Sequence, residues 1–160
     1  SVANVPGLIV LRSLGKFFGL AGVRCGYAFC HERIAREWRI ALGPWSVAGP
    51  ALQAAATALS DSIWQQSTHA LLTRLSAINV NLIAQADWAR GEKIYRSALF
   101  NAIELPASSA MQIEAAFARR AIRLRRIEVD ARTSLLRFGL IDDANTVAWT
   151  RLQQAISDLR

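Results

Sequence analysis

Glycines at positions 15, 19 and 22 interrupt an apolar stretch near the start of the chain, and they limit what that stretch can form. So many glycines in so short a segment disfavour a regular helix and favour tight turns. The run LIVLR at 8–12 is rich in β-branched residues and follows Pro6-Gly7, which predicts a buried strand of an α/β sheet. The segment GYAFC at 26–30 predicts a second strand. Lys16 is therefore expected on a loop that leaves a strand.

Lys16 is unusual because this chain uses arginine for nearly all of its positive charge. Lys16 and Lys93 are its two lysines, among 19 basic residues. Lysine forms Schiff bases with carbonyl compounds where desolvation or a neighbouring cation keeps part of the amine neutral. The Ser13 hydroxyl, the N–H groups of a glycine-rich turn and the Arg24 guanidinium are donors that suit a phosphate dianion. Spacing alone leaves open that Lys16 is a solvated lysine, Ser13 a turn residue and Arg24 a surface ion-pair partner.

Composition indicates a globular chain and narrows its partners. The chain has 160 residues, 52% of them apolar, which is ample for a packed core. The net charge of +7 would allow a nucleic acid or a membrane surface as partner. No nucleic-acid signature accompanies that charge, no charged leader precedes a signal-like core, and no apolar run is long enough to span a bilayer. We expect neither a nucleic-acid nor a membrane partner.

The cysteines and histidines do not indicate a metal site. Cys25 and Cys30 lack the CxxC spacing, and a reduced cytoplasmic compartment is the simplest account of them. His31 and His69 are far apart and have no Cys or carboxylate partner at ligand spacing. We therefore expect no metal, and expect both histidines to be surface or cap residues.

The remaining sequence alternates helical and strand patterns. Helices are predicted at 31–42, ended by Gly43-Pro44, at 50–59, begun by Pro50, and at 61–89, with Asp61 as N-cap and Gly91 as the stop. Beyond them we predict strands at 93–105, 122–129 and 134–141, a helix at 108–121 capped by Ser108 or Ser109, and a helix at 142–159. The order βαββα predicts a small α+β domain with helices on one face of a sheet.

The segment SLGKFFGLAGVRCGY at 13–27 resembles the cofactor-attachment segment of class I/II aminotransferases, written S-x-x-K and then G-L-A-G-x-R-x-G-Y. The resemblance implies that Lys16 binds pyridoxal 5'-phosphate covalently, while Ser13 and Arg24 hold its phosphate. It also implies an α/β chain that forms the C-terminal part of a fold-type I transferase dependent on this cofactor. The expected domains are the end of the cofactor-binding large domain at 1–60, an interdomain helix at 61–90 and the small α+β domain at 91–160.

Two further segments, LGPWSVAGPAL at 42–52 and SLLRFGL at 134–140, resemble a branch of that family. Its members decarboxylate threonine phosphate in cobalamin biosynthesis and are close to histidinol-phosphate aminotransferases. The resemblance implies that Arg137 binds the substrate carboxylate and that Arg125 lies near the substrate's acidic groups. Arg123 or Arg126 could take the role of Arg125, and alternating arginines could instead form a solvated face. We expect Trp45 to be a core aromatic at a domain or subunit contact.

The activity implied by the resemblance is decarboxylation of L-threonine O-3-phosphate to aminopropanol phosphate, with Lys16 as the acid that protonates the carbon. A histidinol-phosphate-type aminotransferase is the first alternative. A noncatalytic fragment or domain whose arginine surface binds an anion is the second. Family members are homodimers, and the alanine-rich helix at 50–59 is the candidate for dimer burial, with packing inside the chain as the alternative.

The resemblance covers only the second half of a family member. The upstream aromatic, asparagine and aspartate that contact the cofactor ring have no counterpart here, and residues 1–5 are expected in the loop before the lysine strand. We therefore expect a fragment that is inactive by itself, with strand edges and apolar faces exposed. Arg96-Ser97-Ala98 also stands where relatives often have Gly-Gly-Thr. The fit of the substrate near that strand stays open.

Overall fold

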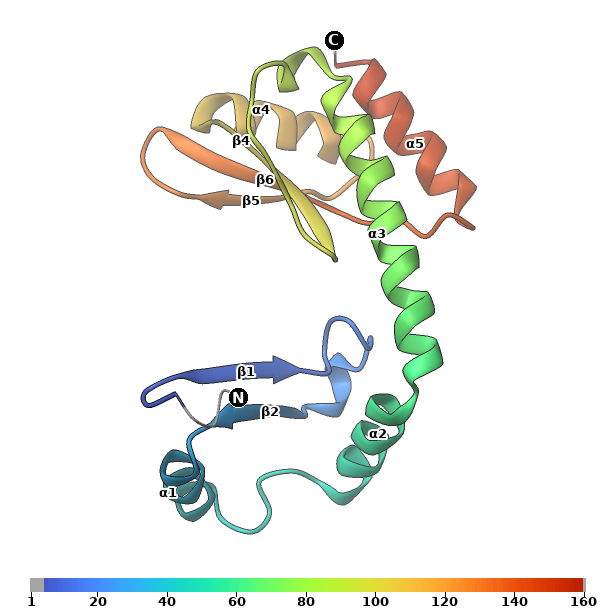
Figure 1. Ribbon diagram of the computed structural model, residues 1–160. Coiled ribbons are helices and arrows are strands. Elements are labelled where there is room, and N and C mark those ends of the chain that lie inside the picture. Colours follow the sequence, from blue (N-terminus) through green and yellow to red (C-terminus); the bar gives the residue numbers. More distant parts are fainter. Residues whose placement is uncertain (1–4, 160) are drawn as a thin grey trace. The chain divides into compact units, whose positions relative to one another are not determined.

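A computed structural model describes residues 5–159, and the chain divides into two compact units, Ser1–Trp64 and Gln65–Arg160 (Figure 1). The expected loop at residues 1–5 lies outside the described residues except for Val5. Among the described residues, no helix combines the length and the apolar character needed to cross a membrane.

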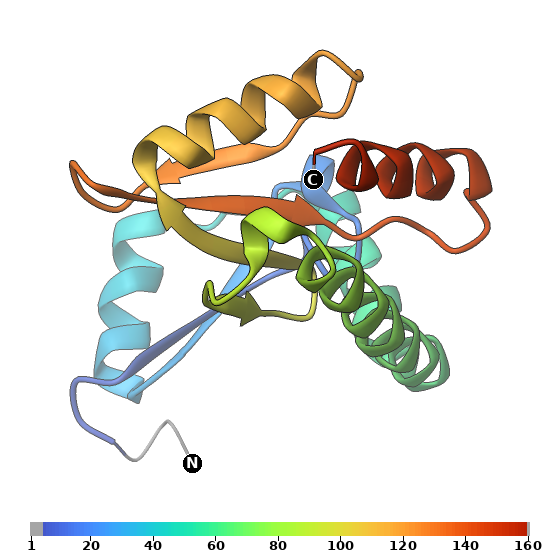
Figure 2. The ribbon, with the colours of Figure 1, turned by 90° about the horizontal axis from the view of Figure 1, so that it is seen from above.

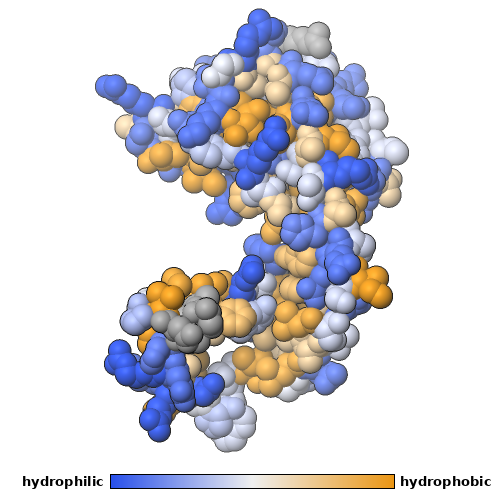
Figure 3. Space-filling view, in the orientation of Figure 1, coloured by the Kyte–Doolittle hydropathy of each residue, from blue (hydrophilic) through white to orange (hydrophobic). Residues whose placement is uncertain are grey.

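The first unit contains a two-stranded antiparallel sheet. Strand β1 (Ile9–Ser13) pairs with β2 (Gly26–Cys30) so that Ser13 lies opposite Gly26, which confirms both predicted strands. The expectation that the first strand is buried is wrong, because Leu11 is 70% exposed. Within the described residues β1 has a single strand neighbour, β2, so its apolar side chains are left without cover. Figure 3 shows hydrophobic residues at the surface of this unit.

Two helices follow as the sequence predicts. Helix α1 (Glu32–Leu42) begins after His31, whose Nδ1 accepts a hydrogen bond from the Arg33 N–H, and α2 (Gly49–Ser60) has Pro50 in its first turn. His31 is thus a cap residue, as expected. Trp45 is not buried within this chain, since it is 91% exposed on the connection between the two helices, and its expected place at a subunit contact stays a prediction.

The long helix α3 (Ser62–Ala84) is shorter than predicted. Asp61 caps it, since the Asp61 carboxylate accepts a hydrogen bond from the Trp64 N–H at 2.9 Å. The helix ends at Ala84 rather than Ala89, and a 3-10 turn, η3 (Asp87–Ala89), follows. The N–H groups of Gln85 and Ala86 donate three residues back, which tightens the last turn and ends the helix before Gly91.

The second unit is a four-stranded antiparallel sheet with helices on one face, as predicted (Figures 1 and 2). The strand order is β3-β4-β6-β5, and the strands are β3 (Ile94–Arg96), β4 (Phe100–Pro106), β5 (Arg125–Glu128) and β6 (Thr133–Gly139). Helices α4 (Ala107–Ala118) and α5 (Thr146–Ser157) pack with the end of α3 around Phe117, Phe138 and Leu136. The core therefore occupies one face of the sheet.

The strand predicted at 93–105 is in fact a hairpin, β3 and β4, joined at residues 97–99. The Ser97 hydroxyl causes the turn: its Oγ accepts hydrogen bonds from the N–H groups of Leu99 and Phe100 and donates to the Phe100 carbonyl. The predicted serine cap of the next helix is also wrong. Helix α4 follows Pro106, which has no side chain that can cap it.

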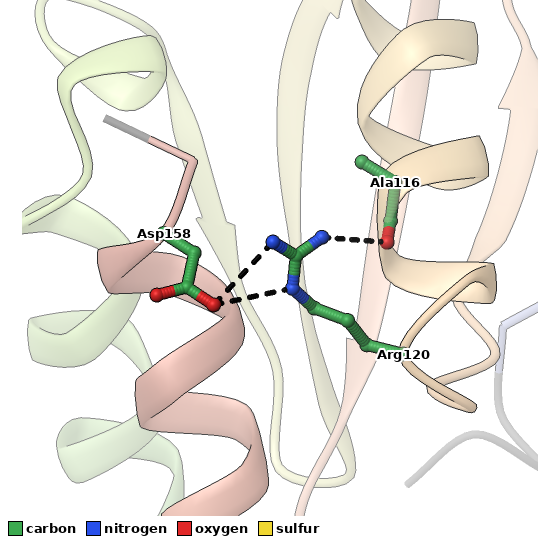
Figure 4. Close-up of polar contacts among 3 residues, drawn as sticks. All are labelled: Ala116, Arg120 and Asp158. Atoms are coloured by element: carbon green, nitrogen blue, oxygen red, sulfur yellow. Dashed lines mark hydrogen bonds and ion pairs between the residues drawn. The ribbon is translucent and has the colours of Figure 1, made fainter.

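Part of the basic run at 119–126 is structural. Arg120, beyond the end of α4, contacts the Asp158 carboxylate at 3.4 Å and donates to the Ala116 carbonyl at 3.2 Å (Figure 4). This arginine joins α4 to the end of α5. Arg120 therefore stabilises the packing of these two helices, and its charge is not available to bind a ligand.

The turn between β5 and β6 depends on Asp130. Its carboxylate accepts hydrogen bonds from the N–H groups of Arg132 and Thr133, each at 2.8 Å. These bonds hold the pKa of Asp130 below its ordinary value of 3.8, because they favour the charged form. The turn sets the register in which β5 meets β6.

We predict that this turn loosens in acid. A carboxyl with a lowered pKa in the folded state adds stability that is fully present above its unfolded pKa and is lost as pH falls through the folded pKa. In NMR spectra, the Arg132 and Thr133 amide protons should therefore shift as pH falls below about 4. Asp130→Asn should abolish that shift, because an amide oxygen accepts the same bonds without titrating. Identical pH profiles for the two proteins would contradict the assignment.

Candidate functional site

Lys16 lies on a loop that the β1–β2 pairing closes. Ser13 and Gly26 are cross-strand partners, and the Leu14 N–H donates to the Cys25 carbonyl just beyond them. Inside the loop the Gly19 N–H donates to the Lys16 carbonyl at 3.0 Å. The Lys16 side chain is exposed. Its predicted place, on a loop leaving a strand, is confirmed.

Buried and aromatic side chains anchor this loop. Leu14 is fully buried, and the Phe17 and Phe18 rings lie 5.5 Å and 5.8 Å from the Trp64 ring at the start of α3. The two phenylalanines also contact each other edge to face at 5.0 Å. Aromatic contacts of this kind add to the stabilisation from area burial. The loop therefore has a hydrophobic base below an exposed lysine.

The loop also carries the donor set expected for a phosphate. The Ser13 Oγ accepts a hydrogen bond from the Gly15 N–H at 3.0 Å, so the hydroxyl hydrogen stays available to donate. Arg24 has a left-handed backbone (φ 53°) and uses one guanidinium nitrogen on the Ala21 carbonyl at 3.2 Å, which leaves its other N–H donors available. The pairing of Ser13 with Gly26 brings Ser13 and Arg24 to the same end of the β1–β2 ladder.

Space and charge in this loop suit an anion. A Cβ on Gly15 would lie 3.3 Å from both the Ser13 Oγ and the Ala21 Cα, so a larger residue would crowd the turn. Residues 5–30 contain Arg12, Lys16 and Arg24 and no Asp or Glu. No carboxylate among residues 5–159 pairs with Lys16 or Arg24. The residues present therefore fit a cofactor that carries both an aldehyde and a phosphate.

The second set of predicted site residues lies on the sheet of the second unit. Strand register places Tyr95, Ala102, Arg137 and Arg125 in one row across β3, β4, β6 and β5. These residues belong to the face opposite the helix-covered core, since their neighbours Ile103, Leu136 and Phe138 are buried. The structure thus brings Arg137 and Arg125 together as direct cross-strand partners. The Lys16 loop and this row belong to different units.

Register also separates Arg125 from its two sequence alternatives. Arg126 points to the other face of the sheet and contacts Glu114 at 3.0 Å and Glu128 at 2.8 Å. These carboxylates, Glu128 foremost, raise the pKa of Arg126. Arg123 lies before the strand begins. Arg125 is therefore the arginine of this run that lies beside Arg137.

The described charged side chains beside Arg125 and Arg137, on the sheet face opposite the core, do not pair with these two arginines. Glu104 accepts a hydrogen bond from the Tyr95 hydroxyl at 2.5 Å, and the Lys93 ammonium lies 4.5 Å from the Tyr95 ring centroid. Tyr95, chiefly through a hydrogen bond with the Lys93 side chain, raises the pKa of Lys93. The charge of Glu104 raises it more weakly. Among residues 5–159, no carboxylate pairs with Arg125 or Arg137. Two like charges in direct cross-strand contact without a counterion favour binding of an anion.

The sequence analysis missed Phe100 and Tyr95, whose rings border this row. The Phe100 ring centroid lies 5.0 Å from the Arg137 guanidinium carbon. The alternation of residues along 100–106 could have placed Phe100 on the exposed face. Its partner across the sheet, however, depends on strand register, which the sequence alone does not provide.

Comparison with known proteins places the chain in a known class. The family model for aminotransferase class I and II matches residues 1–148. The chain is 38% identical over 154 residues to a threonine-phosphate decarboxylase of Pseudomonas aeruginosa, covering 96% of this chain and 44% of that protein. It is 35% identical over 137 residues to a threonine-phosphate decarboxylase of a Sinorhizobium species, covering 86% and 38%.

A solved structure has the same fold. The histidinol-phosphate aminotransferase from Clostridium acetobutylicum superposes with a TM-score of 0.82 at 21% identity, over 99% of this chain and 48% of that one. The chain belongs to the class I and II aminotransferase family and has the fold of the C-terminal part of a fold-type I transferase. It spans less than half the length of the relatives that it matches.

Gly26 provides a test of the loop geometry. A Cβ at this position would lie 2.9 Å from the Arg12 carbonyl oxygen on the paired strand. We predict that Gly26→Ala separates β1 from β2 at the base of the Lys16 loop, at a cost of about 1–3 kcal/mol. Hydrogen exchange of the β1 and β2 amides should then accelerate. Gly139→Ala is the matched control, because nothing lies within 4 Å of the added Cβ. Equal exchange in both variants would contradict the prediction.

Arg125 and Arg126 provide a test of charge. We predict that Arg125→Gln raises the free energy of unfolding by roughly 0.2–1 kcal/mol, because it removes repulsion from Arg137. Arg126→Gln should lower it, because it breaks the ion pairs with Glu114 and Glu128. Urea unfolding at low and high salt measures both effects, and salt should shrink both. Destabilisation by both variants would show that Arg125 is not repelled.

Proposed function

We propose that this chain is the lysine-bearing and substrate-binding part of an enzyme that uses pyridoxal 5'-phosphate to decarboxylate L-threonine O-3-phosphate, giving aminopropanol phosphate. The observation that carries the proposal is the exposed Lys16 on an acid-free loop, bordered by the Ser13 hydroxyl and the Arg24 guanidinium. Two relatives named threonine-phosphate decarboxylase, at 38% and 35% identity, support the choice of reaction.

The loop would hold the cofactor at two points. Lys16 supplies the amine for the aldehyde carbon, and Ser13, Arg24 and backbone N–H groups of the loop supply donors for the phosphate. When bound, the cofactor supplies an electron sink for the carbon that loses its carboxylate. Lys16 would also be the group that carries a proton to the substrate Cα.

The two uncompensated arginines would bind the acidic groups of the substrate. A phosphorylated amino acid carries a carboxylate and a phosphate, and each matches the planar donor fork of a guanidinium. Arg137, which is half-buried, is assigned to the carboxylate, and Arg125, which is exposed, to the region of the substrate's acidic groups. For the assembled enzyme we propose a homodimer, with the surface of α2 as the candidate contact.

A histidinol-phosphate-type aminotransferase is the second candidate. A histidinol-phosphate aminotransferase of Methanosarcina barkeri is 47% identical over 60 residues, although these are 38% of this chain and 16% of that protein. Lys16 and the arginines would serve that reaction equally well, because Lys16 would then remove a Cα proton.

We predict that cofactor binding and turnover both depend on Lys16. The chain, completed with the upstream half of the Pseudomonas aeruginosa relative, should absorb visible light with pyridoxal phosphate and, after borohydride reduction, carry the pyridoxyl mass on the peptide with Lys16. Lys16→Ala should lose both signals. Lys93→Ala is the matched control, because it removes the other lysine and should keep both.

The same completed protein separates the candidate reactions. Carbon dioxide release from O-phosphothreonine is expected for the decarboxylase, whereas amino transfer to 2-oxoglutarate without carbon dioxide would establish the aminotransferase. A pyridoxyl adduct absent from Lys16 would reject both and leave an anion-binding domain. The 160-residue chain alone is expected to show no steady-state turnover.

A further inference from the structure

The surroundings of Arg137 do not explain how its side chain is held. Among residues 5–159, neither an ion pair nor a hydrogen bond engages its guanidinium. Its direct partner on β4 is Ala102, which is too short to support it, and its direct partner on β5 is Arg125, which repels it. A long side chain between these neighbours would sample many rotamers and lose that freedom when it binds a ligand.

Phe100 provides the missing support. It lies opposite Gly139 and therefore diagonally from Arg137 on the same face of the sheet. The centroid of its ring is 5.0 Å from the guanidinium carbon of Arg137. Diagonal neighbours across an antiparallel pair are within reach of an aromatic side chain. The Phe100 side chain is 37% exposed, so this contact lies at the open face.

This contact leaves the binding function of the guanidinium free. A cation is attracted to the face of an aromatic ring, and the attraction uses no N–H donor. The five N–H donors of Arg137 lie in the plane of the guanidinium, and a carboxylate binds to two of them at once. An acidic partner would hold Arg137 equally well but would neutralise it and occupy its donors. An aromatic partner orders the side chain and preserves both charge and donors.

We propose that Phe100 is a positioning residue that holds Arg137 ready for the carboxylate of the substrate. The inference rests on the proposed function in one respect only, the assignment of Arg137 to that carboxylate. Preordering lowers the cost of immobilising a rotamer-rich side chain on binding. A contact at a partly exposed site should change affinity by about two- to fivefold.

The test compares two ligands that differ by the carboxylate. O-Phosphothreonine and aminopropanol phosphate are each titrated into the 160-residue chain, and the Nε–Hε signals of the arginines are followed by NMR. Phe100→Leu should weaken binding of O-phosphothreonine about two- to fivefold and leave that of aminopropanol phosphate unchanged. Phe100→Tyr should restore the affinity. Phe29→Leu is the matched control, since it removes an exposed phenylalanine from β2 in the other unit.

A second readout needs no ligand. In the free chain the Phe100 ring should shift the Arg137 Nε–Hε signal upfield, and Phe100→Leu should remove that shift while Phe100→Tyr keeps it. Urea unfolding of the variants shows whether the sheet itself is intact. A merely structural role of Phe100 would change unfolding and both ligands together, without selectivity for the carboxylate.

The outcomes separate the two proposals. If Arg137→Gln abolishes selectivity for O-phosphothreonine but Phe100→Leu does not reduce it, the positioning role is wrong and the assignment of Arg137 stands. If the wild-type chain shows no preference for the ligand with the carboxylate, the assignment of Arg137 fails and the positioning role fails with it. If the Arg137 Nε–Hε signal keeps its upfield shift in Phe100→Leu, the positioning role is wrong, and this result does not depend on any ligand.

Discussion

Backbone pairing between Ser13 and Gly26 is the interaction on which the lysine loop depends. It closes the loop at its base and brings the Ser13 hydroxyl and Arg24 to one end of the ladder. Gly26 permits that approach because the Arg12 carbonyl lies where a Cβ would collide. Within the loop, the Phe17 ring meets Trp64 edge to face and the Phe18 ring stacks on it, while Lys16 is exposed. The Lys16 amine is thus exposed on a loop whose other described contacts are structural.

In the second unit, two arginines on one face of the sheet carry positive charge that no described carboxylate neutralises. Several other charges of the second unit have partners: Arg126 pairs with Glu114 and Glu128, Arg120 pairs with Asp158, and Glu104 accepts a hydrogen bond from the Tyr95 hydroxyl. Arg125 and Arg137 differ. Register places them side by side, and no carboxylate among the described residues pairs with either of them. Repulsion within that pair costs some stability and is relieved when an anion binds. Their availability is therefore a property of the sheet rather than of either residue.

Local patterns in the sequence were sufficient for most of the elements. His31, Pro50 and Asp61 mark helix starts by capping chemistry that acts within three residues, and each prediction is confirmed. The predictions were wrong in two kinds of place: where a local side-chain hydrogen bond changed the backbone, and where no neighbouring element covers an apolar strand. The Ser97 hydroxyl turned one predicted strand into a hairpin, and the apolar residues of β1 are exposed for want of strand neighbours.

The sequence by itself determined that a lysine lies on a glycine-rich loop between a serine and an arginine, because this is a local pattern and the structure keeps it. Only the tertiary structure decided which arginine of the basic run faces Arg137, and that Phe100 lies over its guanidinium. The reason is physical: a shift of one residue in strand register moves every side chain to the other face, and register is set by pairing between distant segments. Residues that act across strands are therefore recognised only once those strands are paired.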